Sequence, residues 1–219
     1  MIIDMHVHSE VSVDAEATVE EYCRVIQRFR AFHPFHGIVL TEHRQMKPNP
    51  EYRKLAEQYD VLIFQGVEID ANLGHMLLYG MTDAFLKKVD ITHRGLKEQM
   101  VLDTLRECGG IAVPSHPFRG SAFGAALETG QESVKGIKII EEFNGANFPG
   151  ENELASQLVA RNGLKGIGGS DGHFVDKRWF LTCATEFFNP IRTMEDMVSE
   201  LYTGNFRPVM LDNSVLGDF

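Results

Sequence analysis

The chain opens with Met1-Ile2-Ile3-Asp4-Met5-His6-Val7-His8, an apolar run that ends in a His-x-His pair. A short apolar run of this kind predicts a buried strand. Residues two apart on a strand point to the same side, so His6 and His8 are expected to present two imidazoles to one point. A single His-x-His pair also arises by chance, and such a His can simply be hydrogen-bonded in the core. The pair therefore indicates a metal site only if further ligands accompany it.

Several later apolar runs also end in residues that bind metals. The runs 37–41, 61–67, 111–115 and 165–169 lead into His43, Glu68, His116 and Asp171. The run 136–143 is strand-like and ends in Glu141-Glu142, whereas the run 75–79 has its histidine, His75, at the beginning. A last strand is expected near 182–188. Because polar residues recur where strands end, one shared site is expected at that edge of a sheet.

Helical patterns separate these strands. We expect helices over 18–32, 51–59, 93–108 and 151–162, and a last one that opens at Thr193. Thr18 and Glu21 form a capping box, and Gly109 and Gly163 follow two of the helices as stop signals. Strands that alternate with helices predict a parallel sheet, either open or closed into a barrel. The polar strand ends favour the barrel, and 219 residues are few for a full barrel of about 250, so a distorted α/β barrel is expected.

Composition limits the class of protein. The length fits a single domain spanning 1–219, and no apolar run is long enough to span a bilayer. The formal net charge of −10 argues against a long nucleic-acid duplex as partner, because such binding requires a basic surface. Cys23, Cys108 and Cys183 are odd in number and widely spaced. With no signal-peptide pattern at the N-terminus, they predict reduced thiols and a cytoplasmic location.

The candidate ligands form a set of imidazoles and carboxylates. They are His6, His8, Asp14, His43, Glu68, His75, His116, Asp171 and His173. This mixture suits zinc, manganese or iron better than copper, which would bring sulfur ligands. Nine donors are too many for one ion, but with a bridging carboxylate they could hold two or three divalent ions.

The chain resembles the PHP superfamily, named for polymerase and histidinol phosphatase. The pieces that carry the resemblance are Asp4-Met5-His6-Val7-His8-Ser9, Thr41-Glu42-His43, Gly66-Val67-Glu68, Ser115-His116-Pro117 and Gly169-Ser170-Asp171-Gly172-His173. They occur in the family's order. The resemblance implies a distorted barrel of seven strand–helix units that binds zinc, manganese or iron. Its members include phosphatases, phosphodiesterases, nucleases and proofreading domains.

The resemblance also implies three metal positions. The first would be held by His6, His8, Glu68 and Asp171, the second by Glu68 as a bridge with His75 and His116, and the third by Asp14, His43 and His173. The assignment of His75 as a ligand depends on its position rather than on a motif. The alternative is that His75 is a hydrogen-bonded histidine of the core. Glu42 stands where the family has aspartate. We expect this longer side chain to contact a ligand rather than a metal, and to shift His43.

The chemistry predicted from this set is metal-assisted hydrolysis of a phosphate ester in a small molecule or nucleotide. Arg119, three residues after His116, is the best candidate to grip the phosphate, because a guanidinium offers it two hydrogen bonds. Arg44 and Arg178 are weaker candidates. Asp171 or His173 could donate a proton to the leaving group, although metal binding competes with that role.

Other acids and other functions remain open. Glu42, Glu141 and Glu142 could also donate the proton, but solvated or ligand-orienting carboxylates are the plainer reading. Asn144 could line the site or merely shape a turn. There are two alternative functions: a nuclease acting on short or terminal nucleic acid, and a metal-binding module without catalysis. Amidohydrolase barrels also begin with His-x-His, but they use a bridging lysine on a middle strand, where this chain has Glu68.

Overall fold

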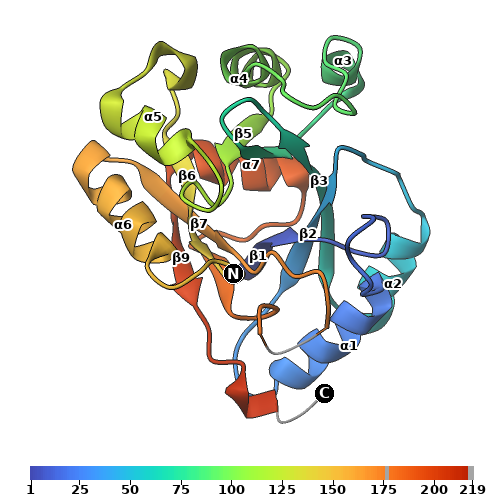
Figure 1. Ribbon diagram of the computed structural model, residues 1–219. Helices are drawn as coiled ribbons and strands as arrows, with labels where there is room; N and C mark the ends of the chain where they lie inside the picture. The colour runs from blue at the N-terminus through green and yellow to red at the C-terminus, as the bar shows by residue number, and fades with distance from the viewer. Residues whose placement is uncertain (176–177, 217–219) are drawn as a thin grey trace.

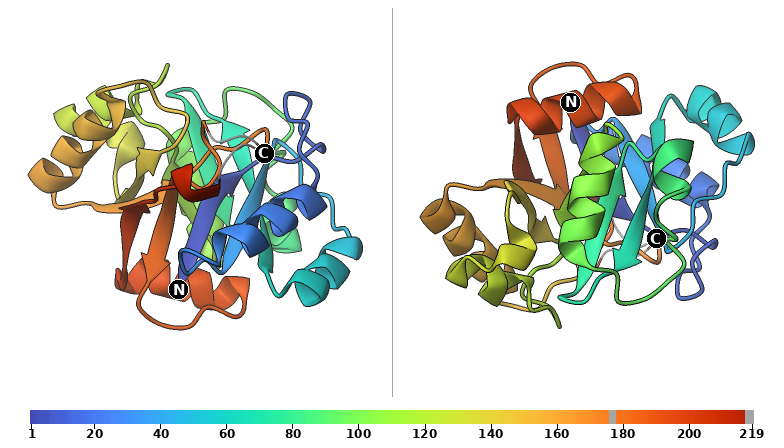
Figure 2. Two further views of the ribbon diagram at one scale, coloured as in Figure 1. Left: turned by 90° about the horizontal axis from the view of Figure 1, so that it is seen from below. Right: turned by 90° about the horizontal axis from the view of Figure 1, so that it is seen from above.

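A computed structural model describes residues 1–175 and 178–216 of the chain. Within these residues one mixed sheet has the order β5-β4-β3-β2-β1-β8-β9, and β6 and β7 form a second, parallel sheet (Figures 1 and 2). The strands are β1 Ile2–Val7, β2 Gly37–His43, β3 Leu62–Asp70, β4 His75–Tyr79, β5 Ile111–Pro114, β6 Ile139–Asn144, β7 Lys165–Gly169, β8 Cys183–Phe187 and β9 Phe206–Met210.

Helices cover the outside of the curled sheet (Figure 1). They are α1 Val19–Phe29, α2 Glu51–Tyr59, α3 Asp83–Leu86, α4 Glu98–Glu107, α5 Phe123–Thr129, α6 Glu151–Asn162 and α7 Met194–Thr203, with 3-10 turns at Glu132–Val134 and Ser214–Leu216. The inside of the sheet is filled by apolar side chains that alternate with outward ones, among them Met5, Val39, Leu77, Val113 and Ile167. This inner core supports the strand ends that carry the polar residues.

The second sheet folds back against β1. Asp171 N–H donates to the carbonyl of His6 at 2.7 Å, and His8 N–H donates to the carbonyl of Gly172 at 2.9 Å. Val7 and Gly172 form a parallel bridge. The loop after β7 is therefore joined directly to the first strand, about 165 residues earlier in the sequence.

The expected α/β fold is confirmed and its sheet is curled, but the sheet is not the parallel one that we expected. β1, β2 and β3 are parallel, whereas β3–β4, β4–β5, β1–β8 and β8–β9 are antiparallel. Only residues 71–74 separate β3 from β4, and a parallel connection requires a dozen residues or more. Among the described residues no ladder joins β5 to β6, so the expected closed barrel of seven strand–helix units is only partly realised.

Local signals placed some helices better than others. α2 and α6 occupy the expected ranges, whereas α1 ends at Phe29 and α4 begins only at Glu98. Residues before Glu98 bind the β3–β4 turn instead, since Leu96 bridges Ala71 and the Glu98 carboxylate accepts from Leu73 N–H at 2.6 Å. α5 and β9 were not expected. No helix in the described ranges is long and apolar enough to cross a membrane.

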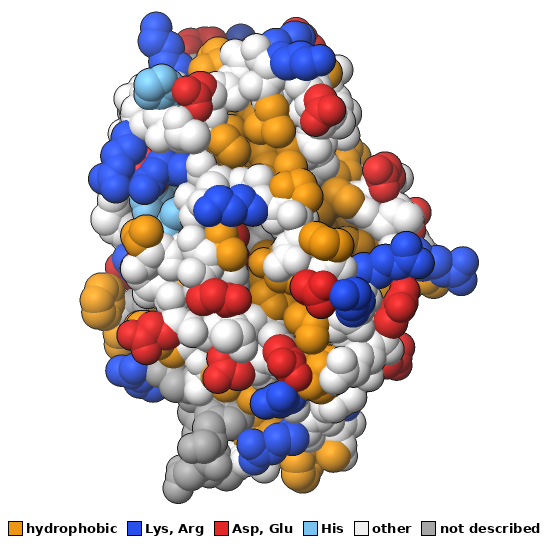
Figure 3. Space-filling view, turned by 90° about the vertical axis from the view of Figure 1, so that its right-hand side faces the viewer, with side chains coloured by type: hydrophobic (Ala, Val, Ile, Leu, Met, Phe, Trp, Pro, Cys, Tyr) orange, Lys and Arg blue, Asp and Glu red, His pale blue; other side chains and the backbone are white. Residues whose placement is uncertain are grey.

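One consequence of the β3–β4 hairpin is an uncovered part of the sheet, because no crossover helix lies between these strands. A hollow there is lined by side chains from β3, the end of β4 and α7, including Ile63, Phe64 and Met81. Figure 3 shows apolar side chains along the middle of the face on this side of the molecule, with charged ones around them.

Candidate active site

The first strand presents two fully buried histidines to one point. The register of β1 against β2 shifts between Asp4 and Val7, which places a bulge at Met5 and His6. Bulges re-aim side chains beside active sites. His6 Nε2 and His8 Nε2 lie 3.0 Å apart, as the i, i+2 spacing predicted. Two basic nitrogens this close, with both rings inaccessible to solvent, need a shared proton or a shared cation.

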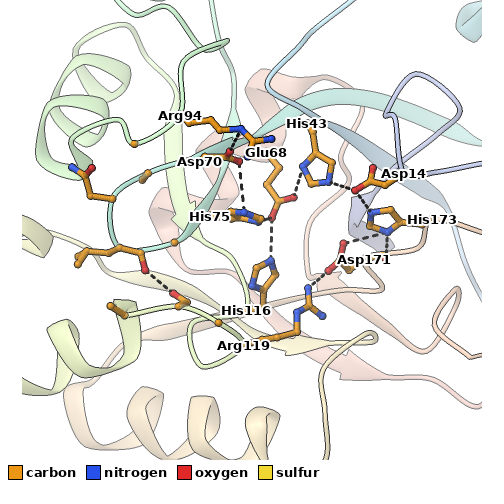
Figure 4. Close-up of a pocket in the computed structure, with 18 residues that line it drawn as sticks. Asp14, His43, Glu68, Asp70, His75, Arg94, His116, Arg119, Asp171 and His173 are labelled. Atoms are coloured by element: carbon orange, nitrogen blue, oxygen red, sulfur yellow. Dashed lines mark hydrogen bonds and ion pairs between the residues drawn. The ribbon is translucent and has the colours of Figure 1, made fainter.

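Glu68, at the end of β3, lies at the centre of the cluster (Figure 4). Its Oε1 is 3.2 Å from His75 Nδ1 and 3.1 Å from His116 Nε2. Its Oε2 is 3.1 Å from His43 Nδ1 and 3.4 Å from His8 Nε2. One buried carboxylate thus contacts histidines from four separate parts of the chain, which is the geometry expected of a bridging ligand.

Asp171 closes the first group of donors. Its Oδ1 lies 3.3 Å from both His6 Nε2 and His8 Nε2. Asp171 has φ of 56° and His116 has φ of 28°, values of positive φ that are uncommon for residues other than glycine. Such strained positions persist where surrounding contacts fix them, and they gather at functional sites. Here the fixing contacts are Asp171 N–H to the His6 carbonyl and His116 N–H to Glu141 Oε2 at 2.8 Å.

The third group is more open. Asp14 Oδ2 lies 3.2 Å from His43 Nε2 and 3.7 Å from His173 Nε2. The rings of His43 and His173 both stack on His8, with centroids 4.3 Å away in each case. All nine residues singled out in the sequence are therefore brought together in one cluster.

Buried carboxylates and imidazoles alter each other's ionisation. Burial alone would lower the pKa of His6, but Asp171, Glu141 and Glu68 outweigh it and raise this pKa well above the usual value. Burial would likewise raise the pKa of Glu68, but His6, His116 and His43 hold it well below its usual range. The protein thus surrounds its carboxylates with positive charge, and a divalent cation would serve the same electrostatic purpose.

Two further acids orient the histidines. His6 Nδ1 lies 2.9 Å from Glu141 Oε1, so the tautomer that donates there leaves the Nε2 lone pair facing the cluster. Glu42 accepts from Ser9 Oγ at 2.6 Å and also from Ser12 Oγ, and Ser12 Oγ in turn accepts from the backbone N–H of His43 at 3.1 Å. Glu42 therefore acts through serines, not on the His43 ring as the sequence suggested.

The donor set fits divalent cations. In three groups every ligand atom lies within 4.8 Å of the others: His6, His8 and Glu68; Glu68, His75 and His116; and His8, His43 and His173. In addition, His116 Nδ1 is buried and has no hydrogen-bond partner among the described residues. Imidazoles and carboxylates at these separations match what zinc, manganese or iron sites use.

A cavity of about 770 Å³ opens beside the cluster, with Arg119 on its wall (Figure 4). Arg119 forms an ion pair with Asp171 and donates from Nη1 to Asn144 Oδ1 at 3.0 Å. Arg94 also lines the cavity. Its side chain is 75% exposed, and its Nε lies 3.3 Å from Asp70 Oδ2.

Two charged residues of the cavity were missed in the sequence. Asp70 lies two residues after Glu68 on the same strand, so the alternation of side chains could have identified it. Arg94 comes from the loop before α4 and carries no local signal. Two expected candidates lie elsewhere: Arg44 does not line the cavity and pairs with Asp70 at 2.9 Å, and Arg178 lies over the Trp179 ring at 5.1 Å.

Comparison with known families shows which family the chain belongs to. The family model described as PHP domain matches residues 4–109, and the model described as PHP-associated matches residues 149–206. The chain belongs to the PHP family. Membership identifies this PHP protein as a metal-dependent hydrolytic enzyme, and the His and Glu clusters described above agree with that class.

Solved structures share the fold of this PHP protein. PsfC from Pseudomonas syringae PB-5123 is 17% identical, with a TM-score of 0.67 over 97% of this chain and 92% of that one. A proposed metal-dependent phosphoesterase from Bifidobacterium adolescentis ATCC 15703 is 18% identical, with a TM-score of 0.55 over 78% and 87%. Endonuclease Q, complexed with a 27-mer duplex, is 14% identical, with a TM-score of 0.68 over 94% and 58%. No curated protein sequence matches the chain.

Proposed function

We propose that this enzyme hydrolyses phosphate esters of small molecules or nucleotides, with two or three divalent ions of zinc, manganese or iron. The observation that carries the proposal is the make-up of the cavity. Glu68, Asp171 and four histidines line the cavity together with two cations, Arg119, which pairs with Asp171, and Arg94, which pairs with Asp70. A phosphate group fits this arrangement, because some of its oxygens can bind metal while others accept hydrogen bonds from arginine.

The three groups set out above, which contain seven of the nine clustered residues, would hold the ions, with Asp171 beside His6 and His8 and Asp14 beside His43. When bound, divalent ions lower the pKa of water and polarise a phosphoryl oxygen. The protein contributes the rest. Glu141 keeps the His6 ring in one orientation, Glu42 and Ser12 fix the backbone of His43, and buried His8 belongs to two of the groups.

We assign the binding of the phosphate group to Arg119. Its guanidinium is held at the cavity wall by Asn144, whose Oδ1 accepts one N–H, so the fork is oriented before a substrate arrives. Such preorganisation reduces the entropy lost on binding. Arg94, with a single ion pair and an exposed side chain, is suited to a more distant anionic or polar part of the substrate.

His173 and Asp171 are our candidates to pass a proton to the leaving group, a role that either can take only where it does not itself hold a metal ion. His173 is better placed, because its side chain remains 17% exposed at the cavity, whereas Asp171 is engaged by Arg119. Burial and the neighbouring His8 lower the pKa of His173, which makes its protonated form a stronger acid. Activity that depends on this proton should therefore fall as the pH rises above that lowered pKa.

The Arg119→Ala variant tests the substrate class. A screen of phosphomonoesters, phosphodiesters and short oligonucleotides, with elemental analysis of the purified protein, should first identify an ester that is hydrolysed. The variant should lose about tenfold to a hundredfold in kcat/KM on it, the value of charged hydrogen bonds to one phosphate, with its metal content unchanged. Arg53→Ala on α2, an exposed arginine paired with Glu57, is the matched control. An unchanged kcat/KM for Arg119→Ala would remove this residue from the site.

A nuclease acting on short or terminal nucleic acid is the second candidate. The likeness to Endonuclease Q over 94% of this chain favours it, while the formal net charge of −10 opposes binding along a duplex. Hydrolysis of single-stranded oligonucleotides that exceeds that of mononucleotide esters would favour the nuclease. An amidohydrolase is less well supported, although one from Chromobacterium violaceum shares the fold at 17% identity, because no lysine lies among the described residues that line the cavity.

A further inference from the structure

A second cavity, of about 270 Å³, lies at the opposite ends of the strands from the cluster. It opens where β5 and β6, which no ladder joins within the described residues, come side by side. Its walls come from α4, α7 and the segments that lead into β5, β6 and β7, and they share no residue with the first cavity. The lining residues are Leu102, Arg106, Ile111, Ala112, Lys135, Gly136, Ile137, Lys138, Ile139, Lys165, Leu201, Tyr202, Thr203 and Gly204.

The charge of this cavity is opposite to that of the molecule. Four of its lining residues are lysine or arginine and none is aspartate or glutamate, although the whole chain carries a formal net charge of −10. Arg106 pairs with Asp103, and Lys135 lies 3.4 Å from Glu132. Lys138 and Lys165, by contrast, have no side-chain partner in the part of the chain that the structure describes.

The two unpartnered lysines lie at the starts of the neighbouring strands β6 and β7, and both line the cavity. Lys138 precedes β6 and Lys165 is the first residue of β7, and Lys165 N–H donates to the Lys138 carbonyl at 2.8 Å. On the opposite wall, Arg106 lies over Gly136, and a Cβ added there would be 3.6 Å from its Nη1. The aliphatic stem of Lys165 lies against Gly204 in the same way, with Cε 3.2 Å from an added Cβ. Both glycines have positive φ, and neither carries a side chain that would occupy the space beside these cations.

The floor of the cavity is apolar. Ile137, Ile139 and Leu201 are buried, and Leu102 and Ile111 are half-buried. Tyr202 is exposed, and its hydroxyl donates to the Gly110 carbonyl at 2.8 Å, which fixes the ring at the edge. An apolar floor with a few convergent polar groups at one side is the usual composition of a small-molecule site.

We propose that this cavity binds a small amphipathic organic anion. Its apolar body lies on the isoleucine and leucine floor, and its carboxylate or phosphate group lies between Lys138, Lys165 and Arg106. Charge complementarity carries the choice of ligand. The chain has ten more acidic than basic residues, yet this cavity is lined by basic residues and no acids, so it favours anions. Its apolar floor favours ligands that also have an apolar part.

The test uses methyl NMR spectra of the full-length, metal-loaded protein with phenylacetate and phenylphosphonate as probes. The first probe represents a carboxylate headgroup and the second a phosphate-like group that is not an ester. Each should produce saturable shifts of the Ile111, Ile137, Ile139 and Leu201 methyl groups. Phenylacetamide, which is neutral and of the same shape, should bind about tenfold more weakly or not at all.

Variants locate the anionic group. Lys138→Ala combined with Lys165→Ala should weaken binding about tenfold, since two partly exposed charge contacts are lost. Lys54→Ala combined with Lys88→Ala, two exposed lysines elsewhere, should leave the affinity unchanged. Saturable binding of only one of the two anions assigns the headgroup. No saturable shift with either anion, equal binding of phenylacetamide, or full affinity in the Lys138/Lys165 variant would overturn the proposal.

Discussion

Glu68 is the residue on which most of the cluster depends. It is 1% exposed, and its two oxygens contact His8, His43, His75 and His116 at 3.1–3.4 Å. A neutral side chain of the same size would keep the packing but remove the negative charge that holds these imidazoles together. The site should therefore lose its metals before it loses its fold.

Accordingly, Glu68→Gln should lower the bound metal by at least one ion per chain and reduce kcat/KM by more than about a hundredfold. Elemental analysis and steady-state kinetics on the identified ester measure both effects. Glu142→Gln is the control, because the Glu142 carboxylate accepts from Ser156 Oγ at 2.7 Å and does not line the cavity. Full metal content in Glu68→Gln would contradict its role as a bridge.

Asp4 shows the electrostatic cost of building this site. Its Oδ1 accepts from His6 N–H at 3.1 Å and Ser170 N–H at 2.8 Å, while its Oδ2 is buried without a hydrogen-bond partner among the described residues. Burial, opposed by the hydrogen bonds from Ser170 and His6, raises the pKa of Asp4 from 3.8 to about 7. The folded protein therefore binds this proton more tightly than the unfolded chain does.

The sign of the pH effect follows directly. Between pH 3.8 and about 7 the folded state retains a proton that the unfolded state releases, so the contribution of Asp4 to stability falls as the pH rises. The Asp4→Asn variant has no carboxyl group at this position, so it does not lose this stability as the pH rises. In metal-free protein, the free energy of unfolding of the variant minus that of the parent should increase from pH 4 to pH 7, by up to about 4 kcal/mol. Denaturant unfolding at several pH values measures it, and parallel pH curves would contradict the prediction.

At the level of elements, the close contact between β1 and β7 positions His6. A Cβ added at Gly169 would lie 2.4 Å from the His6 Cβ and 2.8 Å from the His6 nitrogen, so the two strands would have to separate. Gly169→Ala should therefore destabilise the protein by about 2–4 kcal/mol and weaken metal binding, because overpacking moves rigid backbone. Thermal unfolding and metal titration measure these effects.

Gly130→Ala is the matched control for that variant. A side chain at Gly130 would strain the backbone, since its φ is +66°, but an added Cβ would contact nothing within 4 Å. It should cost about 1 kcal/mol of stability through backbone strain alone and leave metal affinity unchanged. If both variants bound metal like the parent protein, the β1–β7 contact would not be what fixes the His6 ring.

For the whole molecule, bound metal should act as a stabilising link. The cluster joins β1, β2, β3, β4 and the loops after β5 and β7, so ions held there would connect parts of the fold that no ladder joins. Ligands that bind only the folded state stabilise it, by about 2.7 kcal/mol at a hundredfold excess over Kd. Removal of the metal by a chelator should lower Tm by several degrees, as measured by calorimetry. In Glu68→Gln the chelator should change Tm less, and an equal decrease would indicate that it acts elsewhere.

Local patterns in the sequence determined the kinds of residue at the site and much of the secondary structure. His6, His8, Glu68 and Asp171 were found because short apolar runs, which predict buried strands, lead into them. α2 and α6 have the expected bounds because helix starts and stop signals are set by neighbouring residues. The family resemblance added the grouping of ligands, which no local rule supplies.

Tertiary structure alone decided how these pieces meet. The short β3–β4 turn makes the sheet mixed, and the bulge in β1 sets the direction of His6. Glu141, which positions His6, and Arg94, which lines the cavity, come from segments that are distant in the sequence from the residues they lie beside. The physical reason is that hydrogen bonding and burial across strands depend on register, and one inserted residue moves a side chain to the other face without changing the local pattern of the sequence.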